Sequence, residues 1–195
     1  MKKLLLITAM TVFSFAHAQK GTILVLGNVG YYSEKRSDSG SSSTQKTFNF
    51  SPKVGYQYND NWTVGVESSI ANSKQTYTIG EVKSNNFSVG GFVRYMKPIG
   101  GIFSAYADLG TGYQSSDITQ INGGMDPFLF ESKGSGFYVG VTPALFVNIN
   151  KGFGLNFNLG SIGYSTLNYS NARSDTQNFN FSFGQAFSIG ISKNF

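Results

Sequence analysis

The last fifteen residues, FSFGQAFSIGISKNF (181–195), alternate between large apolar side chains and small or polar ones. The odd positions carry the apolar set: Phe181, Phe183, Phe187, Ile189, Ile191 and Phe195. A period of two residues is typical of a β-strand, because successive side chains point to opposite faces of a sheet. The stretch therefore predicts a strand with one strongly apolar face and one face of Ser, Gly, Ala and Asn.

The same alternation recurs along the chain, in segments 22–32, 47–58, 62–70, 87–95, 103–113, 137–147 and 153–163. The connections between the segments alternate in length. Short ones lie near 59–61, 97–101 and 148–152, and long polar ones near 33–46, 72–86, 114–136 and 165–178. Eight strands joined by alternating short and long connections predict an all-β fold, an antiparallel up-and-down meander that closes into a barrel.

The composition decides which face of the sheet meets water. A soluble lipocalin-like barrel would place the aromatic face inside, but eight strands enclose room for modest side chains only. Charged residues make up 13 % of the chain, about half of the ~25 % usual in soluble domains. We therefore expect the apolar face to contact lipid and the small polar face to line the lumen of an eight-stranded transmembrane β-barrel, whose closure satisfies every strand edge.

The N-terminal residues predict export. Lys2 and Lys3 precede an apolar run (4–15), and Ala16 and Ala18 form a small-x-small motif before Gln19, which is the pattern of a signal peptide cleaved after residue 18. The apolar run is too short to span a bilayer as a helix, which needs about 20 residues. The predicted organisation is a signal peptide at 1–18 and a barrel domain at 19–195. The chain has no cysteine, which excludes a lipid anchor on that residue.

Three stretches resemble the outer-membrane β-barrel-domain family: SPKVGYQYNDNWTVGVE (51–67), FSVGGFVRYMKPIGG (87–101) and VTPALFVNINKGFGLNFNLGSIGYS (141–165). These are small eight-stranded barrels, similar to OmpX and the membrane domain of OmpA and abundant in the Bacteroidota. The resemblance implies location in the bacterial outer membrane, with periplasmic termini. It implies fold more strongly than function, because one architecture hosts many activities.

Four charged residues are expected inside the barrel. If the short turn is centred on Asp60, antiparallel pairing places Lys53 directly opposite Glu67, and both point inward. Arg94 and Asp108 also point inward on the next two strands. Buried charges are usually paired, so we predict a luminal charge cluster that fills the barrel. Four separately hydrated charges in a wet lumen are the alternative.

Two further sets of residues are expected on the lipid side. Aromatic residues near strand ends predict interfacial girdles: Tyr31, Tyr56, Tyr58, Trp62, Tyr95 and Tyr113. The final Phe195, with Ile191 and Ile189 on the same face, resembles the C-terminal signal by which the barrel-assembly machinery recognises its clients. The resemblance thus implies that this machinery and periplasmic chaperones are partners during biogenesis.

The chain lacks the usual groups of an enzyme. Its single histidine, His17, is lost with the signal peptide, so the mature chain has no histidine to act as a general base. The loop carboxylates show no paired spacing, and there is no EF-hand pattern. Removing Lys2 and Lys3 lowers the formal net charge from +5 to +3, which is too mild to imply nucleic acid. We predict a protein that is not an enzyme and has no cofactor or metal. A catalytic site built from carboxylates alone, or from Ser and Lys, is the alternative.

The sequence thus predicts an integral outer-membrane protein, a monomer in contact with outer-membrane lipids, with a structural or surface-interaction role. The alternative is a narrow conduit for small or hydrophobic solutes, similar to OmpW. Of the four long loops, the Ser-rich segment 33–46 is expected to be a mobile, solvated linker. An adhesive or phage-contacted epitope is the alternative for this segment. The third is expected to be a projecting hairpin with a two-residue turn at Asn122-Gly123. Pro52 and Pro143 fall inside strands, so a bulge or an unpaired carbonyl is expected opposite each.

Overall fold

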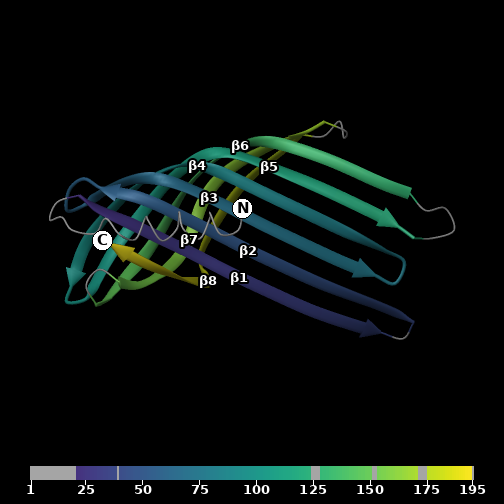
Figure 1. Cartoon of the computed structure of the whole chain (residues 1–195), viewed down its shortest axis with the longest axis horizontal. Coiled ribbons are helices and arrows are strands. Elements are labelled where there is room, and N and C mark those ends of the chain that lie inside the picture. The colour runs from purple at the N-terminus through teal and green to yellow at the C-terminus, as the bar shows by residue number, and fades with distance from the viewer. Residues whose placement is uncertain (1–20, 39, 124–127, 151–152, 171–174, 195) are drawn as a thin grey trace, which may run out of the picture.

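The computed structural model describes residues 21–38, 40–123, 128–150, 153–170 and 175–194. Over these residues the chain forms eight strands: β1 (Thr22–Asp38), β2 (Ser41–Gln57), β3 (Trp62–Tyr77), β4 (Gly80–Gly100), β5 (Phe103–Asn122), β6 (Phe128–Asn150), β7 (Phe153–Tyr169) and β8 (Asp175–Asn194). Each pairs antiparallel with the next, and β1 pairs with β8 to close a barrel (Figure 1). The predicted all-β up-and-down architecture is confirmed. No described helix is long and apolar enough to cross a membrane.

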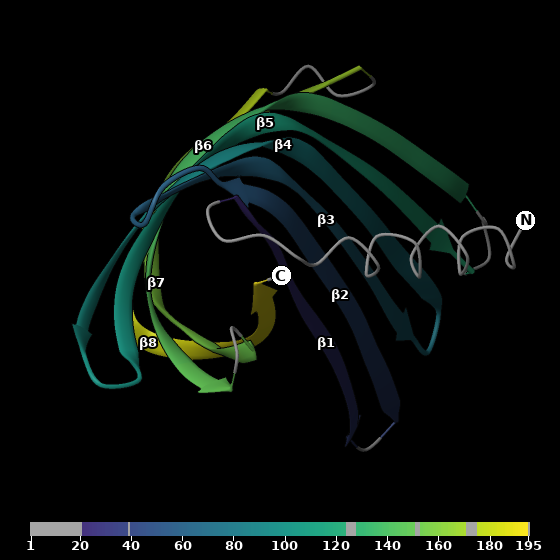
Figure 2. The ribbon, with the colours of Figure 1, turned by 60° about the vertical axis from the view of Figure 1, so that its left-hand side comes forward.

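The strands are longer than a membrane requires. They run from 16 residues in β3 to 23 in β6, whereas a transmembrane strand needs about 9–11. The apolar outward positions cover only part of each strand, such as Ile23 to Tyr31 in β1 and Trp62 to Ile70 in β3. Beyond that band the strands continue as a broad curved sheet, which Figure 2 shows for β1–β6. Much of what the sequence suggested to be long loops is therefore paired strand.

The described residues of the Ser-rich segment 33–46 form a paired hairpin, so the expectation of a solvated linker is wrong. Glu34 pairs with Gln45, and Ser37 pairs with Ser42. Small hydroxyl side chains do not obstruct a strand ladder, and continued pairing with β2 satisfies the backbone groups that a linker would expose to water. The Ser-rich composition indicated a linker. The backbone instead continues the register in which the apolar segments 22–32 and 47–58 pair with each other.

The third connection is a projecting hairpin, as predicted, but its turn does not lie where the sequence predicted. Ile121 pairs with Leu129, and Asn122 with Phe128, so the connection spans 123–127 rather than the two residues Asn122-Gly123. The Gly123 N–H donates to the Ile79 carbonyl oxygen at 3.4 Å. This bond extends the β4–β5 pairing by one residue, toward the β3–β4 turn. The chain therefore does not reverse at the Asn122-Gly123 dipeptide.

Two irregularities accompany the prolines. The β6–β7 register shifts between Val141 and Ala144, so a bulge lies at Pro143 as predicted. At Pro52 the pairing of β2 with β3 is interrupted between Phe50 and Lys53 without a shift of register. Proline lacks the N–H that the ladder needs, and both interruptions fall where that donor is missing.

The seam that closes the barrel is short. β1 and β8 pair only over Leu24–Gly27 and Ile191–Asn194. These residues lie at the end of the barrel that holds the short turns, such as 58–61 and 101–102. Toward the other end, the described parts of β1 and β8 pair only with β2 and β7, and Figure 2 shows β1 running away from β8.

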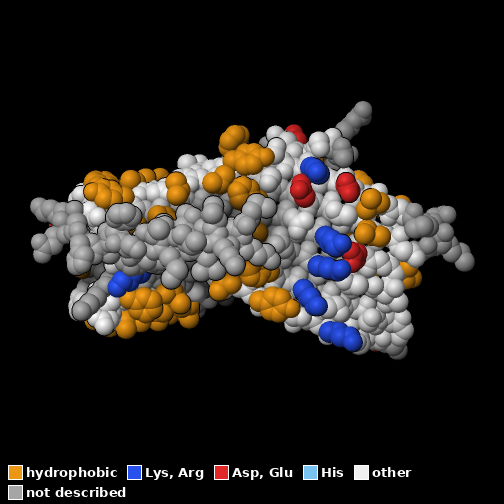
Figure 3. All heavy atoms as spheres, in the orientation of Figure 1, with side chains coloured by type: hydrophobic (Ala, Val, Ile, Leu, Met, Phe, Trp, Pro, Cys, Tyr) orange, Lys and Arg blue, Asp and Glu red, His pale blue; other side chains and the backbone are white. Residues whose placement is uncertain are grey.

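The large apolar side chains lie mainly on the outside. Figure 3 shows them gathered along one half of the molecule, with charged side chains toward the other. Among the described residues, the buried apolar side chains are few and lie inside the barrel in two clusters: Leu24, Leu26 and Phe92, and Tyr106, Ala144 and Phe146. This inverted distribution, with the apolar band outward, is the one that a lipid environment favours.

Candidate functional site

Four charged side chains from four consecutive strands meet inside the barrel. Lys53 lies on β2, Glu67 on β3, Arg94 on β4 and Asp108 on β5. The strand register pairs Lys53 with Glu67 and Arg94 with Asp108. The first pairing is the one that a turn centred on Asp60 predicts. We call these four residues the charged belt.

The belt is one connected network rather than two separate pairs. Lys53 Nζ lies 2.7 Å from Glu67 Oε2 and 3.1 Å from Asp108 Oδ2. Arg94 donates from Nε to Asp108 Oδ1 at 2.7 Å and from Nη2 to Asp108 Oδ2 at 2.9 Å. This two-point contact matches the planar guanidinium to the planar carboxylate. Asp108 is the link, because it accepts from both cations.

The belt is buried to different depths along its length. The side chains of Arg94 and Asp108 are 4 % and 5 % exposed, and those of Lys53 and Glu67 are 19 % and 13 % exposed. Removing such charges from water is costly, and the cost is offset only when each charge keeps a well-placed partner. The Arg94–Asp108 half is therefore the part of the belt most sensitive to loss of a partner.

Aromatic rings extend the belt to both sides. The Arg94 Cζ atom lies 3.7 Å from the centre of the Tyr106 ring, and Lys53 Nζ lies 5.1 Å from the centre of the Phe92 ring. Both distances allow a cation–π attraction. Tyr138 on β6 donates from its hydroxyl to Glu67 Oε1 at 2.8 Å. The connected groups thus come from five strands, β2 to β6.

Two glycines make room for this arrangement. A Cβ atom at Gly110 would collide with the Glu67 carboxylate, and one at Gly90 would collide with the Tyr138 hydroxyl and with the backbone of β5. The inward faces of β4 and β5 must lack a side chain at these two positions, because Glu67 crosses them to reach the Tyr138 hydroxyl. The small residues of the inward face are therefore part of the site.

Further buried side chains fill the lumen beside the belt. Leu24 and Leu26 on β1 pack with Phe92, and Tyr106 packs with Ala144 and Phe146. On the remaining wall, Asn156 Nδ2 of β7 donates to Ser192 Oγ of β8 at 2.8 Å. Together with the belt, every strand contributes at least one largely buried side chain to the interior. That is the expected result for an eight-stranded barrel, whose interior is just wide enough for side chains to fill.

The residues proposed for the aromatic girdles all lie exposed on the outer face: Tyr31, Tyr56, Tyr58, Trp62, Tyr95 and Tyr113. Trp62 and Tyr95 are cross-strand partners at the short-turn end, with ring centres 4.9 Å apart. At the other edge of the apolar band, Tyr113 meets Phe137 edge-on with ring centres 6.4 Å apart. The placement is compatible with two aromatic levels, and the interfacial role stays a prediction.

The structure describes only part of the predicted assembly signal and none of the predicted cleavage site. Ile189 and Ile191 are exposed on the outer face of β8. Phe195 lies outside the described residues, and so do the cleavage-site residues Ala16, Ala18 and Gln19. The assembly signal and the cleavage site therefore stay predictions. Among the described residues, no group of three or more His, Cys, Asp or Glu side chains could hold a metal ion.

Sequence reasoning missed Tyr138 as a member of the site. Its alternation phase places it inward, so a signal was present. The register of β6 could not be derived from the sequence, because it depends on the length of the 123–127 connection and not on the Asn122-Gly123 dipeptide. Without that register, nothing indicated that Tyr138 reaches Glu67 rather than another strand.

The sequence model of the outer membrane protein beta-barrel domain family matches residues 4–187. The chain belongs to this family. Membership in an outer-membrane barrel family, together with the closed barrel and its outward apolar band, places the protein in the bacterial outer membrane. No curated protein sequence matches the chain.

Two solved structures of outer-membrane proteins share the fold, and a third protein aligns less closely. A major outer membrane protein from Thermus thermophilus aligns with a TM-score of 0.57 at 11 % identity, over 91 % of this chain and 100 % of that one. OprG from Pseudomonas aeruginosa aligns with a TM-score of 0.51 at 14 % identity, over 91 % and 97 %. Ail, the attachment invasion locus protein of Yersinia pestis, aligns with a TM-score of 0.41 at 16 % identity, over 90 % and 97 %. At these identities the first two alignments establish a shared fold and nothing more.

Proposed function

We propose that this family member is a structural or surface-interaction protein of the outer membrane, and that its lumen is closed by side chains. The observation that carries the proposal is the connected charged belt, which joins groups from β2 to β6 across the interior. Mobile ions would have to break these contacts or pass the buried apolar clusters. Wide aqueous channels are found in barrels of sixteen or more strands, not eight.

The orientation belongs to the same proposal. In outer-membrane barrels the short turns are periplasmic and the longer connections extracellular. Here the short turns lie at the end of the barrel that also holds the start of β1 and the end of β8. We assign this end to the periplasm, after removal of residues 1–18, and the extended hairpins to the cell surface. Assembly machinery and chaperones would be partners during biogenesis only, and the barrel would act as a monomer.

The hairpin end supports a role in surface interaction. A hollow of about 610 Å³ lies there near the tips of the extended hairpins, bordered by residues that include Arg36, Asp38, Tyr77, Ile79 and Ile121. This volume is within the range of small-molecule sites. The lining mixes apolar and charged groups without a convergent catalytic set, so the geometry favours recognition over catalysis.

Conductance of the refolded protein in a planar bilayer tests the closed lumen. The wild type should show little steady current. The double variant F92A/R94A, which removes a buried ring and the more deeply buried cation of the belt, should conduct if it remains folded. Heat-modifiable gel mobility reports folding independently of current. Large ohmic conductance from the wild type would overturn the proposal.

A second candidate, a narrow conduit for hydrophobic solutes, is favoured by one observation. The β1–β8 seam consists of four residue pairs at the short-turn end, so the wall between β1 and β8 has no described pairing nearer the hairpins. A solute entering from the hairpin end would have a route toward lipid there. Uptake of a hydrophobic probe into liposomes that hold the wild type, without ionic current, would favour this candidate over the first.

A further inference from the structure

Three lysines stand in a row across the outer face of the barrel. The register pairs Lys46 on β2 with Lys74 on β3, and Lys74 with Lys83 on β4. In Figure 3 blue side chains form a row beyond the apolar half of the molecule. Directly opposed residues on neighbouring strands have Cβ atoms about 4.5–5.5 Å apart, and like charges at that spacing are destabilising. An anion beside the row would relieve this repulsion.

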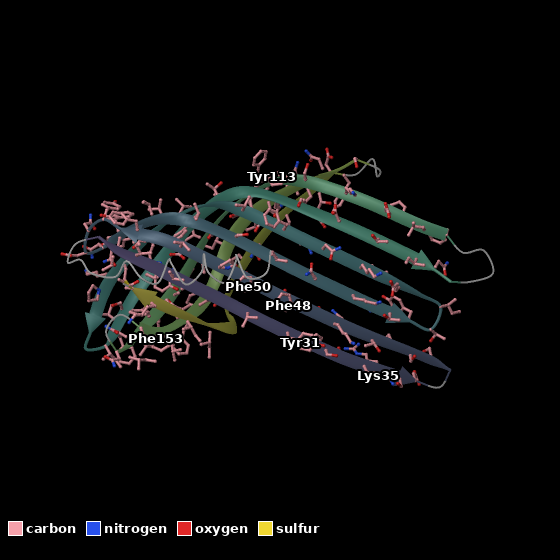
Figure 4. The ribbon with its side chains drawn as sticks, in the orientation of Figure 1. Tyr31, Lys35, Phe48, Phe50, Tyr113 and Phe153 are labelled. Carbon is pink, nitrogen blue, oxygen red and sulfur yellow. The ribbon has the colours of Figure 1, made fainter. Side chains whose placement is uncertain are left out.

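The chain supplies one anion to this row. Glu81 lies 2.6 Å from Lys74 Nζ through Oε2 and 2.6 Å from Lys83 Nζ through Oε1. Within the described part of the chain, Lys46 forms no ion pair. Three lysines and one glutamate leave two positive charges uncompensated. Lys35, exposed on β1 near the hairpin end, adds a further cation on the same side (Figure 4).

Aromatic side chains lie immediately on the membrane side of the row. A groove of about 240 Å³ on the outer surface is bordered by Tyr31 and Phe48 together with the three lysines. Figure 4 shows Tyr31, Phe48 and Phe50 following the outward apolar band along β1 and β2. The groove thus has an apolar part continuous with the lipid-facing surface and a cationic part at the edge of that surface. An amphiphile with an anionic end matches both parts.

We propose that this groove binds the phosphorylated headgroup of a membrane lipid, with Lys46, Lys74 and Lys83 contacting the phosphate and an acyl chain lying along Tyr31 and Phe48. The proposal rests on the apolar band facing lipid, but not on whether the lumen conducts. Lysine ammonium groups bind phosphate as point charges. Basic residues at a membrane surface attract anionic lipids, and the site adds geometry to this attraction because its cations are fixed in register on three strands.

Lipid binding to the refolded barrel in an uncharged detergent tests the proposal, with phosphatidylglycerol as the anionic probe and phosphatidylcholine as the zwitterionic one. Titration followed by native mass spectrometry gives the dissociation constants. The wild type should prefer phosphatidylglycerol. K46Q and K83Q should each weaken its binding about fivefold, the change expected for about 1 kcal/mol per lysine. E81Q should strengthen binding, because it frees two lysines from their internal anion.

The matched control is K97Q, which removes an exposed lysine from β4, the strand of Lys83, at the opposite edge of the apolar band. It should leave the affinity unchanged. Equal loss with K97Q and K83Q, or equal affinity for the two lipids, would overturn the site. Inorganic phosphate should not compete at concentrations where the lipid saturates, and effective competition would overturn the assignment to a lipid. Gel mobility confirms that each variant is folded, and bilayer conductance tests the closed lumen separately.

Discussion

Lys53 and Glu67 face each other across β2 and β3, and each also contacts a strand farther around the wall. Lys53 Nζ reaches Asp108 on β5, and Glu67 Oε1 accepts from the Tyr138 hydroxyl on β6. A cross-strand pair within one hairpin thus becomes a connection across the lumen. The network thus connects strands that are not neighbours in the sheet, and it pairs each of its four charges with an opposite one.

The first prediction concerns the coupling between these two residues. E67Q should lower the stability of the refolded barrel in detergent, measured by urea or thermal unfolding. K53Q should lower the free energy of unfolding less in the E67Q background than in the wild type, because the 2.7 Å contact between Lys53 Nζ and Glu67 Oε2 is already lost there. Residues in one network typically show coupling energies of about 0.5–3 kcal/mol.

The coupling should be incomplete, because Lys53 retains Asp108 in the E67Q variant. A second cycle, between Lys53 and Glu131, provides the control, since Glu131 is exposed near the hairpin end of β6. That cycle should be additive. Strictly additive losses for Lys53 and Glu67 as well would show separately hydrated charges and contradict the network.

The second prediction concerns Arg94, the most deeply buried member of the charged belt, which makes a two-point contact with Asp108. R94Q leaves Asp108 with Lys53 as its only described ion-pair partner and removes the contact with the Tyr106 ring. Breaking a buried ion pair typically costs about 3–5 kcal/mol. R94K should restore only part of the lost stability, because an ammonium group cannot make the two-point contact of a guanidinium. Equal stability of R94K and wild type would show that charge alone matters.

The strand pattern and the central part of the belt could be predicted from the sequence for a simple physical reason. A tight turn fixes the register of its hairpin, so a turn centred on Asp60 placed Lys53 opposite Glu67. The outward apolar alternation fixed which face each side chain occupies, because a slip of one residue would turn that entire set toward the lumen. Local turn geometry and periodicity are both contained in a short stretch of chain.

Features that depend on several strands at once were not accessible in the same way. The contact from Tyr138 to Glu67 spans three hairpins, so it requires the register of every intervening pair. The continuation of the strands through segment 33–46 was missed because its Ser-rich composition resembles a linker. In the structure its residues pair in the same register as the rest of β1 and β2. The lysine row was equally hidden, since Lys46, Lys74 and Lys83 align only through two successive registers, that of β2 with β3 and that of β3 with β4.

The third prediction concerns the space beside Glu67. G110A places a Cβ where the Glu67 carboxylate lies, and overpacking of this kind typically costs about 1–3 kcal/mol. The matched control is G27A, because a Cβ at Gly27 meets nothing within 4 Å. Urea or thermal unfolding of the two refolded variants in detergent measures their stabilities. If G110A were as stable as G27A, the carboxylate would have room to move, and the belt would not be tightly packed at this point.

The fourth prediction concerns the terminal aromatic residue. Deleting Phe195 should reduce the amount of barrel in the outer membrane of cells far more than it reduces refolding in detergent. The difference is expected because a recognition element acts during assembly, whereas a packing residue acts in both settings. F195Y retains an aromatic end and is the control. Equal losses in the two assays would show that Phe195 serves packing alone.

The fifth prediction concerns Glu81, which lies outside the apolar band. Its hydrogen bond with Lys74, followed by that with Lys83, lowers the pKa of its carboxyl below the usual value. A lowered pKa in the folded state means that the contribution to stability is present above the unfolded pKa and is lost as pH falls through the folded pKa. NMR titration of the Glu81 side chain should give a midpoint below that of an ordinary glutamate, and K74Q should raise it. K97Q should leave it unchanged, because that lysine lies at the other edge of the band. A midpoint insensitive to K74Q would mean that Glu81 does not bridge the lysine row, and the two lysines that it now occupies would then be free to bind an external anion.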